Sequence, residues 1–303
     1  MNTTPSSSRI QEIISLLQRY TGPEDSAQRI VLLEEMLRLV ERDADPVMWA
    51  KAQTNLGNAL SKFAEGNRLV HLTEALVHYD LALSVWHPTS FPEWFAITQR
   101  NRGAVLFQMA KLPNCSKPKE LLREAIVCYD TALQAGQDNI SPTNWVKTED
   151  YKSTALLDLA DLLTNRERMQ ALREALACYD VLLAVYDRLA DEAEGKKTLR
   201  KKVRVLHLLI GQIERTERIA ILRDLVTCYD SLLRTSSPDR DRMDCVVTHN
   251  DKGATLRQLA NLLEGSEKIE ILRDTTVALG GTKVEPSRSQ KRQAGERLDQ
   301  LSL

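Results

Sequence analysis

A fifty-residue period constrains this chain more than any other feature. The dipeptide Tyr-Asp recurs at this spacing, and the ten residues before each copy also match. The copies are Tyr79-Asp80, Tyr129-Asp130, Tyr179-Asp180 and Tyr229-Asp230. A weaker fifth copy begins at Ile271. Because repeats of this length form units that stack on one another, the period predicts an elongated array with a continuous apolar core.

Each unit contains two segments with helical spacing, which we call helix A and helix B. In one helix B, Leu122, Ile126, Tyr129 and Leu133 follow one another at steps of four, three and four residues, which places them on one face of an α-helix. Helix A recurs between the Tyr-Asp segments with a leucine at a fixed place. These leucines are Leu60, Leu106, Leu156, Leu206 and Leu256.

Turn-forming residues are scarce and fall between the helical segments. The 303 residues include only 12 glycines and 10 prolines, which argues against sandwiches and barrels. Thr89 or Ser90 before Pro92, and Ser141 before Pro142, are expected to cap helices. We therefore predict an all-α fold, a right-handed α-α superhelical solenoid of about six antiparallel helix pairs.

The ends of the array depart from the repeat. Leu279 replaces the repeated tyrosine and is followed by two glycines. We expect a disordered start over residues 1–7, a helical repeat domain over residues 8–279, and a flexible or loosely docked tail over residues 280–303.

Composition excludes several classes of protein. No apolar run approaches the roughly 20 residues that span a bilayer, and the first residues lack the charge and apolar pattern of a signal peptide. The net charge of −1 disfavours a dedicated nucleic-acid binder. Five cysteines without a CxxC pair indicate a reducing cytosol. We expect a cytoplasmic protein without a membrane partner.

No catalytic constellation emerges from the residue pattern. Cys128, Cys178 and Cys228 share one repeat position, where a small buried side chain is the expected role. No two of the five histidines have the i, i+4 spacing of a helical zinc site, and no phosphate-binding loop is present. The sequence predicts no enzyme activity, no metal and no cofactor.

The repeated helix A and helix B segments resemble those of tetratricopeptide repeat proteins. The segment from Asn55 to Leu60 looks like the core of their first helix, and Ala75, Tyr79 and Ala82 look like the small, aromatic and small positions of their second. The resemblance covers about residues 8–279, although the family's usual period is about 34 residues. The longer period, with Trp49 and other tryptophans opening helix A, resembles bacterial arrays associated with caspase-like CHAT peptidases.

The resemblance implies that helix A lines a concave groove. Two asparagines match residues that hold ligand backbone or carboxylate in peptide-binding members, whereas Thr54 and Tyr151 do not match the basic residues of that carboxylate clamp. The residues placed toward the groove are Lys51, Asn58, Arg100, Asn101, Lys147, Lys197, Arg200 and Arg204. A basic groove would attract an acidic segment or a chain terminus of a protein partner.

Two charge patterns have a structural alternative. The basic stripe from Lys196 to Arg204 is either part of this groove or a solvated helix face. Arginine followed by an acidic residue recurs every fifty residues, as in Arg123-Glu124, and we interpret this as an ion-pair network between repeats.

The leading hypothesis is a non-catalytic scaffold or regulatory subunit that binds a peptide or partner protein. By family analogy, that partner is a caspase-like peptidase or a bacterial defence or signalling complex. One alternative is a self-assembling oligomer joined through the end repeats. The other is a helical-repeat RNA binder, against which the neutral charge and few aromatic residues argue.

Overall fold

The computed structural model describes residues 5–136, 141–211, 213–236 and 242–280. Within these ranges the chain forms twelve α-helices and one short 3-10 helix, and no strand. The all-α prediction is confirmed, as is the alternation of two helices per repeat. Helix packing divides the chain into two units, Met1–Val185 and Tyr186–Leu303.

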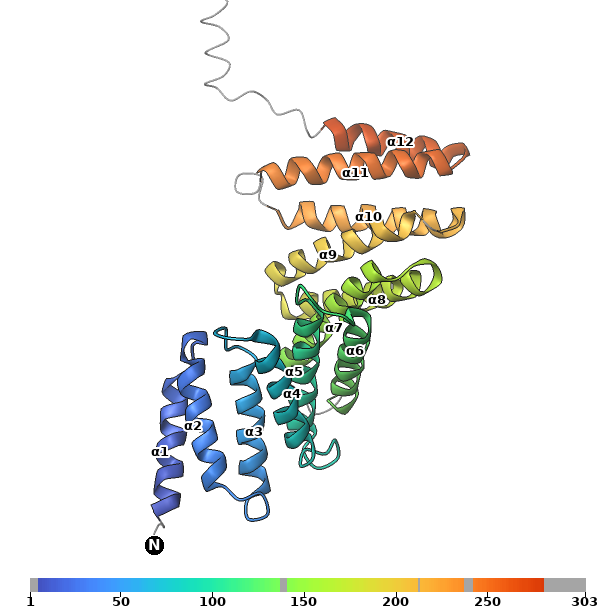
Figure 1. Ribbon diagram of the computed structural model, residues 1–303. Helices are drawn as coiled ribbons and strands as arrows, with labels where there is room; N and C mark the ends of the chain where they lie inside the picture. Colours follow the sequence, from blue (N-terminus) through green and yellow to red (C-terminus); the bar gives the residue numbers. More distant parts are fainter. Residues whose placement is uncertain (1–4, 137–140, 212, 237–241, 281–303) are drawn as a thin grey trace, which may run out of the picture. The chain divides into compact units, whose positions relative to one another are not determined.

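In the first unit, each helix from α1 to α6 packs against the next in chain order, antiparallel to it (Figure 1). The elements are α1 Pro5–Arg19, η1 Pro23–Asp25, α2 Ser26–Leu39, α3 Pro46–Leu60, α4 Arg68–Leu83, α5 Pro92–Ala110, α6 Pro118–Ala135, α7 Pro142–Leu162 and α8 Asn165–Leu189, whose last residues belong to the second unit. Helix α1 begins three residues before the expected start of the repeats. The predicted tail beyond Gly280 lies outside the described residues.

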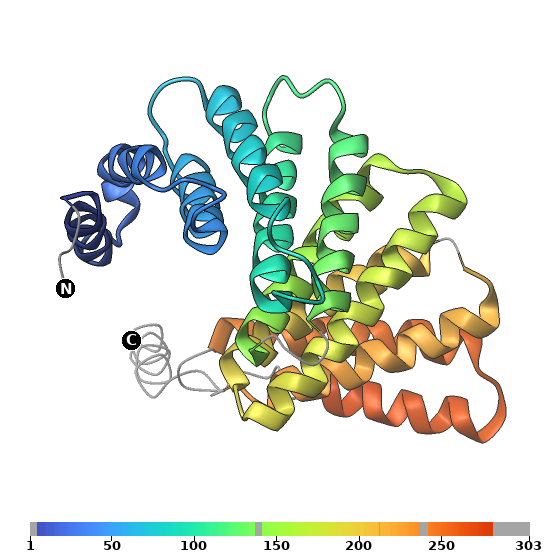
Figure 2. The ribbon, with the colours of Figure 1, turned by 90° about the horizontal axis from the view of Figure 1, so that it is seen from below.

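The second unit has the same organisation. Its helices are α9 Glu192–Ile210, α10 Arg215–Arg234, α11 Arg242–Leu262 and α12 Gly265–Gly280. Each packs on its neighbour in chain order, and Figure 2 shows this order from a second direction. No helix in the described ranges is both long enough and apolar enough to span a bilayer.

Proline and polar caps set the helix starts. Pro46, Pro92 and Pro142 occupy the first helical turn, where the missing N–H costs nothing. Ser141 caps α7 as predicted, with its side chain accepting from the backbone of Asn144. The prediction that Thr89 or Ser90 caps α5 is wrong. Phe91 is its N-cap residue and makes no side-chain cap bond, because a phenylalanine side chain has no hydrogen-bond acceptor.

The repeated tyrosines fill the space between helices A and B. Tyr79, Tyr129 and Tyr179 are fully buried. A Cβ atom added to Gly103 would lie 2.8 Å from the ring of Tyr129 and 3.0 Å from the carbonyl oxygen of Ala125. The small residue of helix A therefore allows the aromatic ring of helix B to approach the backbone closely.

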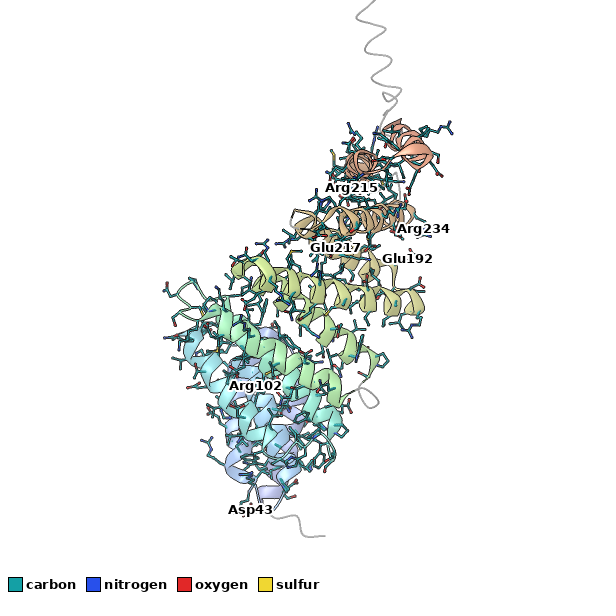
Figure 3. All side chains as sticks on the ribbon, turned by 90° about the vertical axis from the view of Figure 1, so that its right-hand side faces the viewer. Asp43, Arg102, Glu192, Arg215, Glu217 and Arg234 are labelled. Carbon is teal, nitrogen blue, oxygen red and sulfur yellow. The ribbon has the colours of Figure 1, made fainter. Side chains whose placement is uncertain are left out.

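The aspartate of the Tyr-Asp dipeptide ties helix B to the following helix A. Arg102 of α5, labelled in Figure 3, pairs with Asp80 of α4 and with Glu124 of α6, both at 2.8 Å. Lys152 pairs with Asp130 at 2.6 Å, fifty residues further on. The recurring arginines of helix B also link repeats, in agreement with their interpretation as ion-pair partners: Arg123 of α6 pairs with Glu167 of α8, and Arg223 of α10 pairs with Glu267 of α12.

The second unit continues this pattern. Lys252 pairs with Asp230 at 2.5 Å, and the mostly buried Lys202 pairs with Asp224 at 2.8 Å. Basic residues thus recur at 102, 152, 202 and 252. Each directly precedes the helix A position that Gly103 occupies in its own repeat. The fifty-residue period is consequently a period of ion pairs as well as of packing.

Candidate functional site

The site is built on α3, α5 and α7 of the first unit, which are successive A helices. Side chains join each of them to the next. Thr54 of α3 lies 3.3 Å from Thr98 of α5 between their hydroxyl oxygens. Further along α5, Arg100 reaches α7, where its Nη1 donates to Oδ1 of Asn144 at 2.8 Å. The A helices are therefore joined through side chains, of which Thr54 and Thr98 are buried and Arg100 and Asn144 are half-buried.

Arg100 is held by amide oxygens alone. Besides its bond to Asn144, its Nε and Nη2 donate to Oδ1 of Asn101 at 3.4 and 3.3 Å. No carboxylate pairs with Arg100 within the part of the chain that the structure describes. The three bonds use three of the five guanidinium N–H groups. One N–H on each terminal nitrogen is left without an acceptor among the described residues.

Asn58 extends this cluster onto α3. Its Oδ1 accepts from Nδ2 of Asn101 and from the hydroxyl of Tyr79, both at 2.8 Å. The two asparagines selected from the sequence therefore bond to each other. Asn58 also anchors a repeated tyrosine of helix B. We refer to Asn58, Arg100, Asn101 and Asn144 as the Arg100 cluster.

The electrostatic setting of the Arg100 cluster is cationic and partly desolvated. All four residues are half-buried. Burial lowers the pKa of Arg100, and the side chains that act on it most are the hydroxyls of Tyr151, Tyr79 and Tyr129 rather than carboxylates. An arginine keeps its charge under these conditions because its intrinsic pKa is above about 12. The charge is therefore present and is not neutralised by a described carboxylate.

Asn144 is the member that sequence reasoning missed. It lies 44 positions after Arg100, in the first turn of the next helix A of the fifty-residue repeat. Nothing in an asparagine at a helix start distinguishes it from an ordinary capping residue, so no signal in the sequence selects it.

Two other predicted residues lie in the first unit outside the Arg100 cluster. Lys51 of α3 places its Nζ 5.3 Å from the ring centre of Trp94, and it lines a 440 Å³ cavity whose apolar walls come from α1, α2 and α3. Lys147 is exposed on α7, three residues after Asn144 and so on the same helix face. Lys147 adds positive charge beside the Arg100 cluster.

The three predicted residues of the second unit have a different environment. Arg200 of α9 pairs with Asp244 of α11, and Lys197 pairs with Glu194 at 2.5 Å. Arg204 is exposed on the same helix. Arg200 and Lys197 are therefore already partnered by carboxylates, which reduces the positive field predicted for this stripe.

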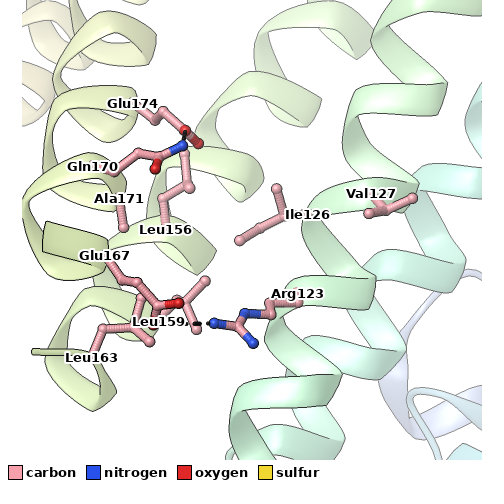
Figure 4. Close-up of a pocket in the computed structure, with 10 residues that line it drawn as sticks. All are labelled: Arg123, Ile126, Val127, Leu156, Leu159, Leu163, Glu167, Gln170, Ala171 and Glu174. Atoms are coloured by element: carbon pink, nitrogen blue, oxygen red, sulfur yellow. Dashed lines mark hydrogen bonds and ion pairs between the residues drawn. The ribbon is translucent and has the colours of Figure 1, made fainter.

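A separate groove lies between α6, α7 and α8 (Figure 4). It has a volume of 290 Å³ and an apolar floor that includes Ile126, Leu156 and Leu159. Arg123 and Glu167 pair across it at 3.4 Å. This pair bridges the groove, and the other acidic residue of the lining, Glu174, accepts from Nε2 of Gln170 at 3.0 Å.

In the described ranges, no cluster of side chains is suited to nucleophilic or metal-binding chemistry. The five cysteines are free, and Cys128, Cys178 and Cys228 are buried. Burial raises the pKa of the Cys128 thiol, which keeps it protonated. No group of three or more potential metal ligands comes together in the part of the chain that is described.

Comparisons with known proteins find a structural similarity but no sequence match. No family model matches the chain, and no curated protein sequence matches it. A solved structure, the crystal structure of the yeast Tom70, is similar over 98% of this chain and 68% of that chain, at 13% identity and a TM-score of 0.23. A similarity of this size carries no argument about function, which therefore depends on the geometry of the site.

Proposed function

We propose that this protein is a non-catalytic interaction scaffold that binds an acidic peptide or partner protein on its A helices. The observation that carries the proposal is the Arg100 cluster. It combines a cation without a carboxylate partner with amide donors on three adjacent helices. Lys147 adds an exposed cation on the same side of α7 as Asn144. Such a surface attracts negative charge before contact and bonds to it afterwards.

The surrounding fold suits this role. In stacked helix pairs, binding comes from a row of side chains on rigid helices. The ion pairs from Arg102 and Lys152 fix α5 and α7 against their neighbouring helices. The Arg100 cluster is thus positioned by packing that is independent of a ligand. The five free cysteines support a reducing compartment.

A finer proposal concerns the partner. The long repeat period and the tryptophans of helix A favour a caspase-like peptidase, or a bacterial defence or signalling complex, as the regulated partner. This step depends on the motif resemblance alone. Co-purification of such a peptidase with the chain, together with a change in its proteolytic rate, is the expected result. A rate that is unaffected by saturating scaffold would contradict the regulatory role.

Affinity capture followed by mass spectrometry tests the main proposal. The wild-type chain is compared with the double variant Arg100→Glu, Lys147→Glu. The matched control is Arg123→Glu, Lys119→Glu, which makes the same charge change on α6. The proposal predicts that partners captured by the wild type are lost from the first variant and retained by the control. Equal retention by both variants would show that the A helices of the first unit are not the binding face.

Self-association is a second candidate, favoured by the surface of α12. Ile269 and Leu272 lie one turn apart on this end helix and are 55% and 43% exposed. An apolar surface of this kind can pair with a second copy of the chain. Light scattering at micromolar concentration is expected to show a dimer that Ile269→Lys dissociates. A wild-type monomer under these conditions would remove this candidate.

A further inference from the structure

The last helix B exposes a face that the other B helices bury. One leucine occupies the same place in every helix B, and in α12 this residue is Leu272, which is 43% exposed. Ile269 and Arg273 are also exposed and lie on the same face of α12, because they are three residues before and one residue after it. In the other B helices the equivalent leucine is at most 2% exposed, at Leu33, Leu72, Leu122, Leu172 and Leu222.

The groove of Figure 4 shows how an inner repeat covers this face. One of its walls is helix B of the preceding repeat, α6, which contributes Arg123 and Ile126. The following helix pair supplies the rest of the groove. Its lining residues are Leu159 and Leu163 at the end of α7, and Glu167, Gln170 and Ala171 near the start of α8.

The first helix pair has the same groove without the wall from a preceding helix B. This α1–α2 groove has a volume of 360 Å³. Leu16 and Tyr20 lie three residues before and one residue after the end of α1, as Leu159 and Leu163 do in α7. Its other lining includes the third, sixth and seventh residues of α2, as in α8, and these are Gln28, Val31 and Leu32. In the described part of the chain, no helix B covers this groove, and Val31 is 60% exposed.

From these two surfaces we infer that α12 of one copy packs into the α1–α2 groove of a second copy, so that copies join head to tail as consecutive repeats do. The inference rests on self-association, the second candidate above, and specifies the surface that α12 contacts. The contact removes Ile269 and Leu272 of one copy and Val31 of the other from water. Because the two surfaces are unlike, a dimer keeps one open groove and one exposed α12, and further copies can add to it.

The arginine that follows the repeated leucine favours the same register. At two junctions inside the array this arginine pairs with the third residue of the next helix B, which is Glu167 in α8 and Glu267 in α12. On α12 the equivalent arginine is Arg273, and the third residue of α2 is Gln28. The amide oxygen of Gln28 can accept a hydrogen bond from a guanidinium but brings no negative charge. The junction between copies is therefore expected to be weaker than the junctions inside the chain.

A gain of affinity tests this register. Gln28→Glu supplies the carboxylate that the inner junctions have, and should tighten self-association about two- to fivefold at low salt. The gain should disappear at high salt, and also when Arg273→Gln is introduced into the same chain. No gain at low salt, or a gain that persists with Arg273→Gln, would contradict the proposed contact.

Mixing two blocked variants of the full chain, followed by analytical ultracentrifugation, is the decisive experiment. Val31→Lys blocks the groove and Ile269→Lys blocks α12, and each alone should weaken self-association about tenfold or more. Their equimolar mixture should form a dimer and nothing larger, because it contains one intact groove for each intact α12. The matched control is Val77→Lys, which makes the same change at a 53% exposed valine of α4 and should associate like the wild type.

The outcomes separate this inference from the functions proposed above. If Val31→Lys associates like the wild type and Ile269→Lys does not, two α12 helices contact each other, so self-association stands and the head-to-tail contact is wrong. A monomeric wild type overturns both, whether residues 281–303 or solvent cover α12, and leaves the scaffold function to the capture experiment. Circular dichroism of each variant confirms that it is folded, and both lysines replace residues that are more than half exposed.

Discussion

Gly57 of α3 lies directly against the ring of Tyr79 of α4. A Cβ atom added to Gly57 would stand 2.7 Å from Cε1 of Tyr79, closer than real Cβ atoms approach their neighbours. The ring is 1% exposed, and its hydroxyl is tied to Asn58 at 2.8 Å. The tyrosine therefore cannot move aside without breaking a bond of the Arg100 cluster.

The first prediction is that Gly57→Ala destabilises the protein. Overpacking at this contact should lower the free energy of unfolding by about 1–3 kcal/mol, measured by denaturant titration followed by circular dichroism. Gly211→Ala is the matched control, because nothing lies within 4 Å of its added Cβ and its φ of −70° suits alanine. If both variants were equally stable, Gly57 would not be required by the ring of Tyr79.

A second prediction compares the stability contribution of Arg102, which pairs with two carboxylates, with that of Arg123, which pairs with one. Arg102 joins α4 to α6 through two carboxylates with 20% of its side chain exposed, whereas Arg123 meets Glu167 with 53% exposed. Arg102→Met should cost about 1–2 kcal/mol, and Arg123→Met less than about 1 kcal/mol, because exposed pairs contribute little. Thermal unfolding at low and high salt compares them. A greater loss for Arg123→Met would contradict the assignment of Arg102 as the link between repeats.

A third prediction concerns alkaline pH. Burial raises the pKa of Tyr229 to about 12 and raises the pKa of Tyr79 and Tyr129 above the ordinary range. The unfolded chain ionises its tyrosines near pH 10. Since only the unfolded form loses these protons readily, stability should be constant below about pH 10 and fall as the pH rises above it. Tyrosinate absorbance and circular dichroism should change together, whereas full ionisation in a still-helical protein would show that the rings are accessible.

A fourth prediction concerns how Asn144→Asp and Asp244→Asn change the stability of the protein. Asn144→Asp adds a carboxylate beside the half-buried Arg100 and should raise the free energy of unfolding by up to about 1 kcal/mol. Asp244→Asn removes one beside the exposed Arg200 and should lower it by a smaller amount. Chemical denaturation of both variants checks the signs. A destabilised Asn144→Asp would indicate that Arg100 is already neutralised in the wild type.

Much of the fold could be predicted from the sequence because the same residue pattern recurs in several repeats. The spacing of Leu122, Ile126 and Tyr129 predicts the buried face of α6, and all three are buried. The tyrosine and the small residue opposite it are also visible as repeated letters. The start of α5 could not be predicted in the same way. Either Thr89 or Ser90 can cap a helix, and only the backbone at Phe91 decides that neither does.

The candidate site could be predicted only in part. Reading the repeat register selected Asn58, Arg100 and Asn101, which the structure brings together. The same reading gave Arg200 equal weight, although Asp244 partners it. The difference depends on which side chain of the next A helix reaches the guanidinium. The charges along one helix do not reveal this partner, because it lies 44 residues further along the chain.

Hydrogen–deuterium exchange of the full chain, with and without acetylated hexaglutamate amide, shows which helices bind an acidic peptide. If the A helices of the first unit form the binding face, the peptide should slow exchange in α5 and α7 and leave α9 and α11 unchanged. Slower exchange confined to α9 and α11, or no change anywhere at saturating peptide, would contradict the account.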